Sequence, residues 1–232
     1  MSETVSISTL DGSGRFDCYL ARPAGTPRAA IVVIQEIFGV NAGIRRKCDK
    51  LAEEGYLALA PDLFCRLKPN VELNPDVDSE FKTALELMGQ FDQDEGVRDI
   101  EAAIKFARHS EGCAKVGVVG YCLGGRLAYM TAARTDADAS VGYYAVGIDN
   151  LLREKHAIAR PLMLHIAGGD HFVGPEIQQA MHEGLDDHPK VTLCDYPGLD
   201  HGFATEIGSR RNEEGAQLAD KRTAEFFAEH LG

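Results

Sequence analysis

The sequence predicts an α/β fold, a three-layer sandwich in which helices cover both faces of a mostly parallel sheet. Short, wholly apolar runs recur along the 232 residues, as expected for strands buried on both faces of such a sheet. Amphipathic patterns of helical period lie between these runs. This alternation is typical of right-handed crossovers, and it places ligands at the carboxyl ends of the strands. Because no repeat or long Pro/Gly/Ser linker divides residues 1–232, we expect a single domain.

The chain begins with an expected antiparallel hairpin over residues 4–21. Two segments rich in strand-forming residues, VSIST and FDCYLAR, flank the turn signal Asp11-Gly12. Such a hairpin is expected to form one edge of the sheet.

Six later apolar runs predict the other strands. They are AAIVVI (29–34), LALA (57–60), KVGVVG (115–120), SVGYYAV (140–146), PLMLHIA (161–167) and VTLCDYP (191–197). Helices are predicted after Asn41, a possible N-cap, around Val97 to Ala107, and over about the last fifteen residues. The polar, proline-containing segment 65–80 interrupts this rhythm and predicts a surface excursion that lines a pocket near the strand ends.

Composition narrows the classes of partner. Hydrophobic residues make up 44% of the chain, and 24 basic against 36 acidic residues give a net charge of −12. This charge opposes binding to nucleic acid or to anionic membranes, so we expect neither partner, and an anionic substrate would need a local cationic pocket. The N-terminus has no basic region followed by an apolar one, which favours a cytoplasmic protein.

The six cysteines do not form a ligand pattern. They are scattered, without a C-x-x-C pair or a His/Cys cluster, which predicts reduced thiols and no structural zinc: Cys18, Cys48, Cys65, Cys113, Cys122 and Cys194. We expect no metal and no organic cofactor.

The pentad Gly-Tyr-Cys-Leu-Gly at residues 120–124 follows a buried strand and precedes a helical pattern. This is the setting of a nucleophile elbow, in which glycines allow close packing and the central side chain projects above the sheet. The helix N-terminus would favour the thiolate of Cys122 and stabilise an oxyanion. A small, inert, buried cysteine is the alternative reading.

A nucleophile needs a base and a carboxylate that orients the base. Asp170 follows one predicted strand in LHIAGGDHF, and His201 follows the next in YPGLDHGF. The order nucleophile, acid, base matches that of α/β-hydrolases. We therefore predict a Cys122, Asp170 and His201 triad, and we interpret Asp200 and His171 as structural neighbours and His165 as a core histidine with satisfied hydrogen bonds.

The chain closely resembles the dienelactone hydrolase (carboxymethylenebutenolidase) family of α/β-hydrolases. The resemblance runs nearly from end to end, through VIQEIFGVN, GYLALAPDLF, GVRDIEAAI, KVGVVGYCLGGRLAY, VGYYAVG, GGDHFV and the DHGF turn. It implies that Cys122 is the nucleophile, His201 the base and acid, and Asp170 its partner. It also implies that Glu36 pairs with the resting thiol, and that the backbone N–H groups of Ile37 and Leu123 form the oxyanion hole. A paired carboxylate that merely holds its loop is the alternative for Glu36.

The resemblance implies hydrolysis of a small-molecule lactone or enol ester, such as a dienelactone, to a maleylacetate-type product through a thioester. Family members hold the substrate carboxylate with arginines directly after H-x-F-A and in the excursion helix, but this chain has Thr205 and SEFKTALEL there. Lys82, Arg210 and Arg211 are candidate replacements, unless they are only solvated surface cations. Further candidates for the pocket lining are Phe38, Tyr144 and Phe203, of which the first two could instead be core residues.

Other functions remain open at this stage. A broader lactonase or carboxylesterase is the nearest, and the fold also serves ligand receptors and thiol redox sensors. The complete set of Cys122, Asp170, His201 and Glu36 argues against a receptor. A disulfide switch would need a second cysteine, and none lies near Cys122 in the sequence. A monomer and a small homo-oligomer are equally compatible with the sequence.

Overall fold

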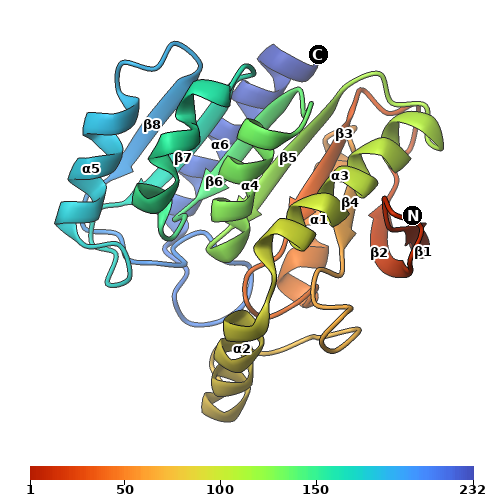
Figure 1. Ribbon diagram of the computed structural model, residues 1–232, viewed down its shortest axis with the longest axis horizontal. Coiled ribbons are helices and arrows are strands. Elements are labelled where there is room, and N and C mark those ends of the chain that lie inside the picture. The colour runs from red at the N-terminus through yellow and green to blue at the C-terminus, as the bar shows by residue number, and fades with distance from the viewer.

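The computed structural model describes residues 1–232 and contains one eight-stranded sheet (Figure 1). The strand order is β1-β2-β4-β3-β5-β6-β7-β8. The strands are β1 (Ser2–Ser8), β2 (Arg15–Ala21), β3 (Ala30–Ile34), β4 (Leu57–Pro61), β5 (Val116–Tyr121), β6 (Ala139–Tyr143), β7 (Leu162–Ala167) and β8 (Val191–Tyr196). All eight predicted strands are therefore present, within a few residues of the predicted bounds.

Only the N-terminal hairpin departs from parallel pairing. The strand β2 pairs antiparallel with both β1 and β4, whereas β3 to β8 pair parallel. The inner strands β3, β4, β5, β6 and β7 are buried along their whole length, which explains their unbroken apolar runs. The predicted α/β fold class is confirmed.

Helices cover both faces of the sheet (Figure 1). They are α1 (Ala42–Glu53), α2 (Asp78–Gln90), α3 (Gln93–His109), α4 (Leu123–Arg134), the 3-10 helix η1 (Ile148–Ala157), α5 (Pro175–Leu185) and α6 (Glu213–Leu231). Figure 1 shows α3, α4 and α5 on the near face and α1 and α6 on the far face. Each face carries its own apolar cluster, so the sheet separates two cores.

The observed helices agree with the predicted ones in part. Asn41 caps α1, since its side chain accepts hydrogen bonds from the N–H groups of Gly43 and Ile44. The C-terminal helix has 19 residues rather than about fifteen. The sequence analysis did not identify η1 and α5, because both are short and partly exposed. No helix has the length and apolar character needed to cross a membrane.

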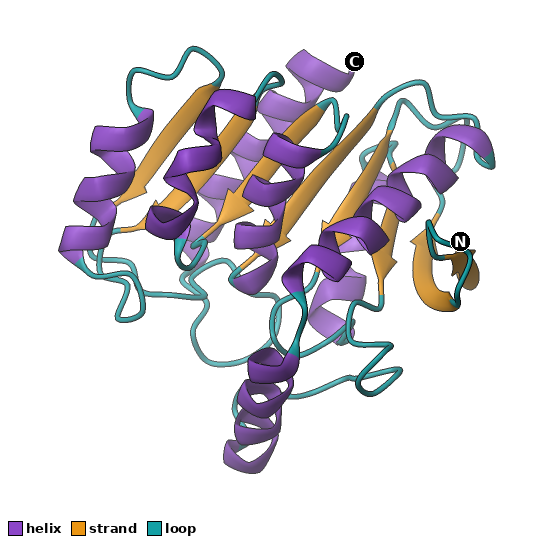
Figure 2. Cartoon of the chain, viewed as in Figure 1, coloured by secondary structure: helices purple, strands orange, loops and turns teal.

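The carboxyl ends of the parallel strands bring distant residues together. Glu36 follows β3, Cys122 follows β5, Asp170 follows β7 and His201 follows β8. Figure 2 shows α2 projecting beyond this edge of the sheet, where the excursion between β4 and α3 leaves the body of the protein. The candidate catalytic residues and the segment that was expected to line a pocket therefore lie at the same edge of the sheet.

Candidate active site

Cys122 lies in a strained turn between β5 and α4. Its backbone has φ 57° and ψ −114°, a region that residues with a side chain rarely adopt. Close packing forces the turn: a Cβ added to Gly120 would lie 1.9 Å from the carbonyl oxygen of Gly124, and one added to Gly124 would lie 2.5 Å from that of Gln35. The strain holds the thiol above the sheet, at the N-terminus of α4, as the pentad predicted.

Two backbone N–H groups beside Cys122 have no acceptor within the protein. They belong to Leu123, the first residue of α4, and to Ile37 in the loop after β3. Ile37 lines the same cavity as Cys122. Free donors of this kind are suited to an oxygen that gains negative charge during acyl transfer.

His201 and Asp170 form a buried pair. The Nδ1 atom of His201 lies 2.8 Å from Oδ2 of Asp170, and both side chains are almost fully shielded from solvent. Asp170 is itself held by the backbone N–H groups of Phe172 and Val173, at 2.8 and 3.2 Å from its Oδ1 atom. The Nε2 atom of His201 is buried and has no hydrogen-bond partner, so it is free to exchange a proton in the cavity.

The electrostatic surroundings favour a protonated His201. Burial alone would lower its pKa, but negative charge on Cys122 and the hydrogen bond to Asp170 outweigh burial and raise the pKa to about 10. The imidazolium form is thus stabilised as long as the sulfur is an anion. If the sulfur loses its charge, the main cause of the raised pKa disappears.

Glu36 is a buried carboxylic acid near the nucleophile. Burial raises its pKa, although His201 and the hydroxyl of Tyr144 act in the opposite direction. The hydroxyl of Tyr144 donates to Oε1 of Glu36 at 3.3 Å. Glu36 makes no hydrogen bond to Cys122, so the pairing with the thiol implied by the family resemblance is absent and Tyr144 is the partner instead.

Glu36→Gln is expected to change how stability depends on pH. The folded protein retains a proton on Glu36 that the unfolded chain releases above the ordinary pKa of 4.5. The free energy of unfolding of the wild type therefore falls as pH rises from 4.5 through the raised pKa, and glutamine removes this loss. In urea unfolding from pH 4 to 8, the free energy of unfolding of Glu36→Gln should increase relative to that of the wild type as pH rises. A difference that stays constant with pH would contradict the raised pKa.

The other polar groups have structural roles. His165 is fully buried, and its ring nitrogens contact the hydroxyls of Tyr196 and Thr223 at 2.8 and 2.9 Å, which confirms the interpretation of a satisfied core histidine. Burial lowers the pKa of His165 to about 3. Asp200 accepts hydrogen bonds from His171 and from the backbone of His201, and so fixes the loop that carries His201.

The residues at this edge do not form a convincing metal site. Asp170, His171 and Asp200 lie close enough to share an ion. Both oxygens of Asp170 are already committed, one to His201 and the other to two backbone N–H groups. Oδ1 of Asp200 similarly accepts the ring of His171 and two backbone donors. The three residues therefore stabilise one another.

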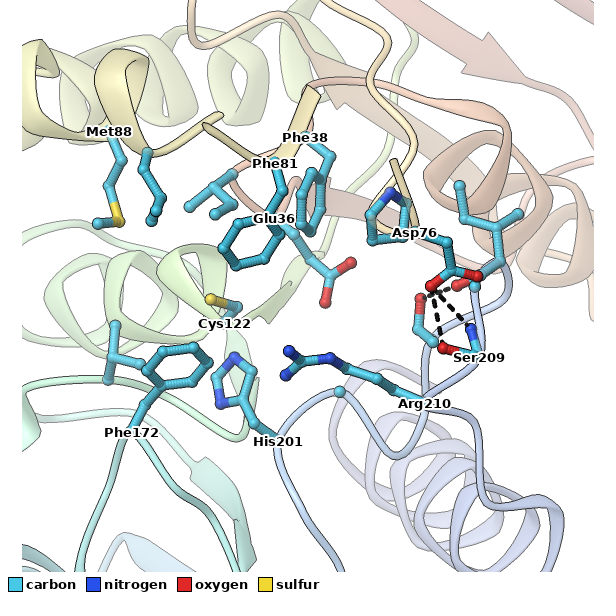
Figure 3. A pocket seen from close by; sticks show the side chains of 18 residues that line it. Glu36, Phe38, Asp76, Phe81, Met88, Cys122, Phe172, His201, Ser209 and Arg210 are labelled. Atoms are coloured by element: carbon cyan, nitrogen blue, oxygen red, sulfur yellow. Dashed lines mark hydrogen bonds between the residues drawn. The ribbon is translucent and has the colours of Figure 1, made fainter. Parts of the chain in front are cut away.

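A cavity of about 270 Å³ opens above Cys122 (Figure 3). Its lining comprises Glu36, Ile37, Phe38, Pro75, Asp76, Phe81, Leu85, Met88, Cys122, Val146, Phe172, His201, Gly202, Thr205, Ile207, Gly208, Ser209 and Arg210. Pro75 and Asp76 come from the predicted excursion, so that segment does line a pocket. The residues that carry the thiol, the free Nε2 atom and the N–H of Ile37 therefore line one cavity.

Of the predicted substrate-binding residues, Phe38 and Arg210 line the cavity. Figure 3 shows the guanidinium of Arg210 pointing in toward Glu36 and His201. Lys82 is exposed on α2 and does not line the cavity, because it lies one helical step from the inward residue Phe81. Arg211, also a candidate, pairs with Glu213 and Glu206 instead.

Two further predicted lining residues lie behind the cavity wall. Tyr144 and Phe203 are each about 1% exposed, and their rings pack against one another with centroids 5.6 Å apart. Tyr144 also packs edge-on against His201. The prediction that they line the cavity is therefore wrong: Tyr144 supports Glu36 and His201, Phe203 packs against Tyr144, and neither side chain reaches the cavity surface.

Sequence reasoning missed the contribution of α2. Phe81, Leu85 and Met88 line the cavity from this helix. Their spacing of four and then three residues is the period of one helical face, and this signal was available in the sequence.

Comparisons with known proteins agree on one group. The family model described as "Dienelactone hydrolase family" matches residues 16–231. The chain is 39% identical to a carboxymethylenebutenolidase of Pseudomonas putida and 38% identical to carboxymethylenebutenolidase 1 of Cupriavidus pinatubonensis; each alignment covers 98% of this chain and 97% of the relative. A crystal structure from Klebsiella pneumoniae, provisionally named a dienelactone hydrolase, has a TM-score of 0.84 and 26% identity, and the alignment covers 98% of this chain and 99% of that one.

Proposed function

The chain belongs to the dienelactone hydrolase family and is a hydrolase of carboxylic esters, and from this premise we propose that it opens lactones or enol esters through a thioester on Cys122. One observation carries the proposal. The strained Cys122, the free Nε2 atom of the His201–Asp170 pair and the free N–H of Ile37 meet at one cavity.

The first half of the reaction forms the thioester. The thiolate of Cys122 attacks the substrate carbonyl carbon, and the carbonyl oxygen takes up negative charge opposite the N–H groups of Leu123 and Ile37. Collapse of this intermediate breaks the ester bond, and the departing enolate receives the proton from Nε2 of His201, which leaves a neutral imidazole. A resonance-stabilised leaving group suits a thiolate, which expels amines poorly.

The second half regenerates the enzyme. Once Cys122 is acylated it carries no charge, and the pKa of His201 falls because the main cause of its increase has gone. The neutral imidazole then accepts a proton from water while the hydroxide attacks the thioester. Departure of the thiolate restores the ion pair, and the net reaction consumes one water and produces an acid and an enol.

Glu36 is assigned a role in the protonation of the resting thiol. Burial raises its pKa, so this carboxyl can take the thiol proton and keep it at a pH at which an ordinary carboxylate is ionised. The bond to Tyr144 supports a position in which Glu36 is turned away from Cys122, as required after it has taken the thiol proton. Glu36 and Tyr144 therefore act before the attack on the substrate.

We assign to Arg210 the role of binding a carboxylate group of the substrate. Its guanidinium forms no salt bridge within the protein and lies over the ring of Phe172, 5.9 Å from the ring centroid. The chain as a whole is acidic, so an anionic substrate needs such a local cation. Arginine also offers a planar pair of donors that match a carboxylate.

Hydrolysis of cis- and trans-dienelactone beside p-nitrophenyl acetate tests the proposal. We expect the wild type to prefer the anionic lactone, and Arg210→Gln to lower the lactone-to-acetate ratio of kcat/KM by about 10- to 100-fold through loss of a charge-assisted hydrogen bond. Arg211→Gln, at the neighbouring arginine paired with Glu213, should retain the wild-type ratio. Turnover of p-nitrophenyl acetate alone would exclude dienelactones as substrates, and an unchanged ratio in Arg210→Gln would exclude this role for Arg210.

A further inference from the structure

Large apolar side chains that are exposed to solvent gather at the mouth of the cavity. Eight such side chains are exposed in the protein: Met1, Leu10, Leu67, Val77, Leu85, Met88, Phe172 and Leu218. Three of them, Leu85, Met88 and Phe172, line the cavity and are 42%, 36% and 47% exposed. Single exposed apolar residues are ordinary, but a group of them around a concave site indicates a binding surface.

The helix α2 contributes one side of this surface. Its buried residues, Ala84 and Leu87, anchor the helix, and the ring of Phe81 packs on that of Phe38 with centroids 5.8 Å apart. Leu85 and Met88 lie on the same helical side as Phe81 and continue it toward solvent. The exposed part of the Leu85 and Met88 side chains has no protein contact and is available to a ligand.

The loop after β7 contributes the opposite side. Phe172 packs edge-on against His201, with ring centroids 4.9 Å apart. Val146, which follows β6, also lines the cavity. We refer to Phe81, Leu85, Met88, Val146 and Phe172 together as the apolar wall. Figure 3 shows Met88 and Phe81 above Cys122 and Phe172 below it, with Asp76, Ser209 and Arg210 to the right.

At the polar end of the cavity, Asp76 and Ser209 are hydrogen-bonded to each other. Oδ1 of Asp76 accepts hydrogen bonds from the backbone N–H and the hydroxyl of Ser209, at 3.1 and 3.0 Å. A substrate with its carboxylate at Arg210 and its carbonyl at Cys122 would therefore extend, if it is longer, along the apolar wall.

We propose that the apolar wall is a subsite for a hydrocarbon portion of the substrate, so that the enzyme favours esters or lactones bearing an alkyl or aryl extension of several carbons. This inference rests on the proposed attack by Cys122. Removing the extension from water between α2 and Phe172 lowers the free energy of the bound complex in proportion to the apolar area covered.

Two ester series test the subsite and tell the acyl side from the alcohol side. p-Nitrophenyl esters from acetate to octanoate lengthen the acyl group, and acetate esters from ethyl to octyl lengthen the alcohol. A fully buried methylene would raise kcat/KM about fourfold. The wall is open to solvent on one side, so we expect about twofold per methylene in one series, or more than tenfold from acetate to hexanoate.

Variants assign the effect to the apolar wall. Leu85→Gln/Met88→Gln keeps good helix-forming residues at exposed positions of α2 and should lower the long-to-short selectivity ratio at least about fivefold. Leu218→Gln is the matched control, since Leu218 is a helical leucine that is 45% exposed on α6, away from the cavity. It should retain the wild-type ratio.

Each other outcome is decisive. Flat profiles in both series from an active wild type, or an unchanged ratio in the double variant, would overturn the subsite and leave the proposed function standing. Absence of turnover of every ester would overturn both. A dimer in sedimentation that the double variant dissociates, with the ratio unchanged, would make the apolar wall an interface between copies and overturn the subsite.

Discussion

Cys122→Ala is expected to lower kcat/KM for every ester by about 10⁴- to 10⁶-fold. The other hydroxyl side chains of the cavity, Thr205 and Ser209, are bonded to Ile207 and Asp76 and cannot replace the thiol. The residual rate would come from the donors of Leu123 and Ile37 and from substrate binding. The fold should survive, since alanine is smaller than cysteine and the side chain is only partly buried.

Mass spectrometry after rapid quenching provides the direct readout. Wild-type protein mixed with p-nitrophenyl acetate should gain one acetyl group on the peptide that contains Cys122, and Cys122→Ala should gain none. Cys194→Ala is the matched control, because Cys194 is another partly buried free cysteine and lies outside the cavity. A Cys122→Ala variant that keeps more than a tenth of the wild-type activity would rule out the thioester.

His201→Gln is expected to lower kcat/KM by about 10³- to 10⁵-fold, and Asp170→Asn by a smaller factor of about 10² to 10⁴. The first variant removes the group that transfers protons at Nε2. The second keeps the imidazole but loses the carboxylate at 2.8 Å that orients it and stabilises its protonated form. The order of the two effects follows from these direct and indirect roles.

Alkylation by iodoacetamide separates activation of the thiol from the later proton transfers. Because His201 in its protonated form stabilises the thiolate, His201→Gln should slow alkylation of Cys122 at pH 7. His182→Gln is the control, since His182 also pairs with aspartates, Asp186 and Asp195, but lies on α5 outside the cavity. Equal alkylation rates and near-normal turnover in His201→Gln would show that another group is the base.

The sequence is informative where local pattern decides the structure. The inner strands are predictable because each is an apolar run buried on both faces. The candidate triad is predictable because each member follows a strand within a few residues. The turn at Cys122 is equally predictable from its pentad, because the close backbone contacts at Gly120 and Gly124 leave no room for a side chain. In these cases a short segment and its fold class determine the position of a residue.

The sequence is less informative where long-range packing decides. The hydroxyl of Tyr144 reaches Glu36 across 108 residues of sequence, and nothing local to either residue indicates the bond. Arg210 enters the cavity because the loop after His201 turns back over it at Ser209, which Asp76 holds. The position of Lys82, by contrast, does follow from local pattern. Helical periodicity places Lys82 next to the face of α2 that carries Phe81, and therefore outside the cavity.

The position of α2 affects how readily this enzyme can diversify. The helix stands beyond the strand ends and contributes only Ala84 and Leu87 to the buried residues, so mutations elsewhere on it cost little folding free energy. Some of those same positions line the cavity. Lineages carrying this fold can therefore drift toward new esters through α2, while the tightly packed turn at Cys122 keeps the reaction itself unchanged.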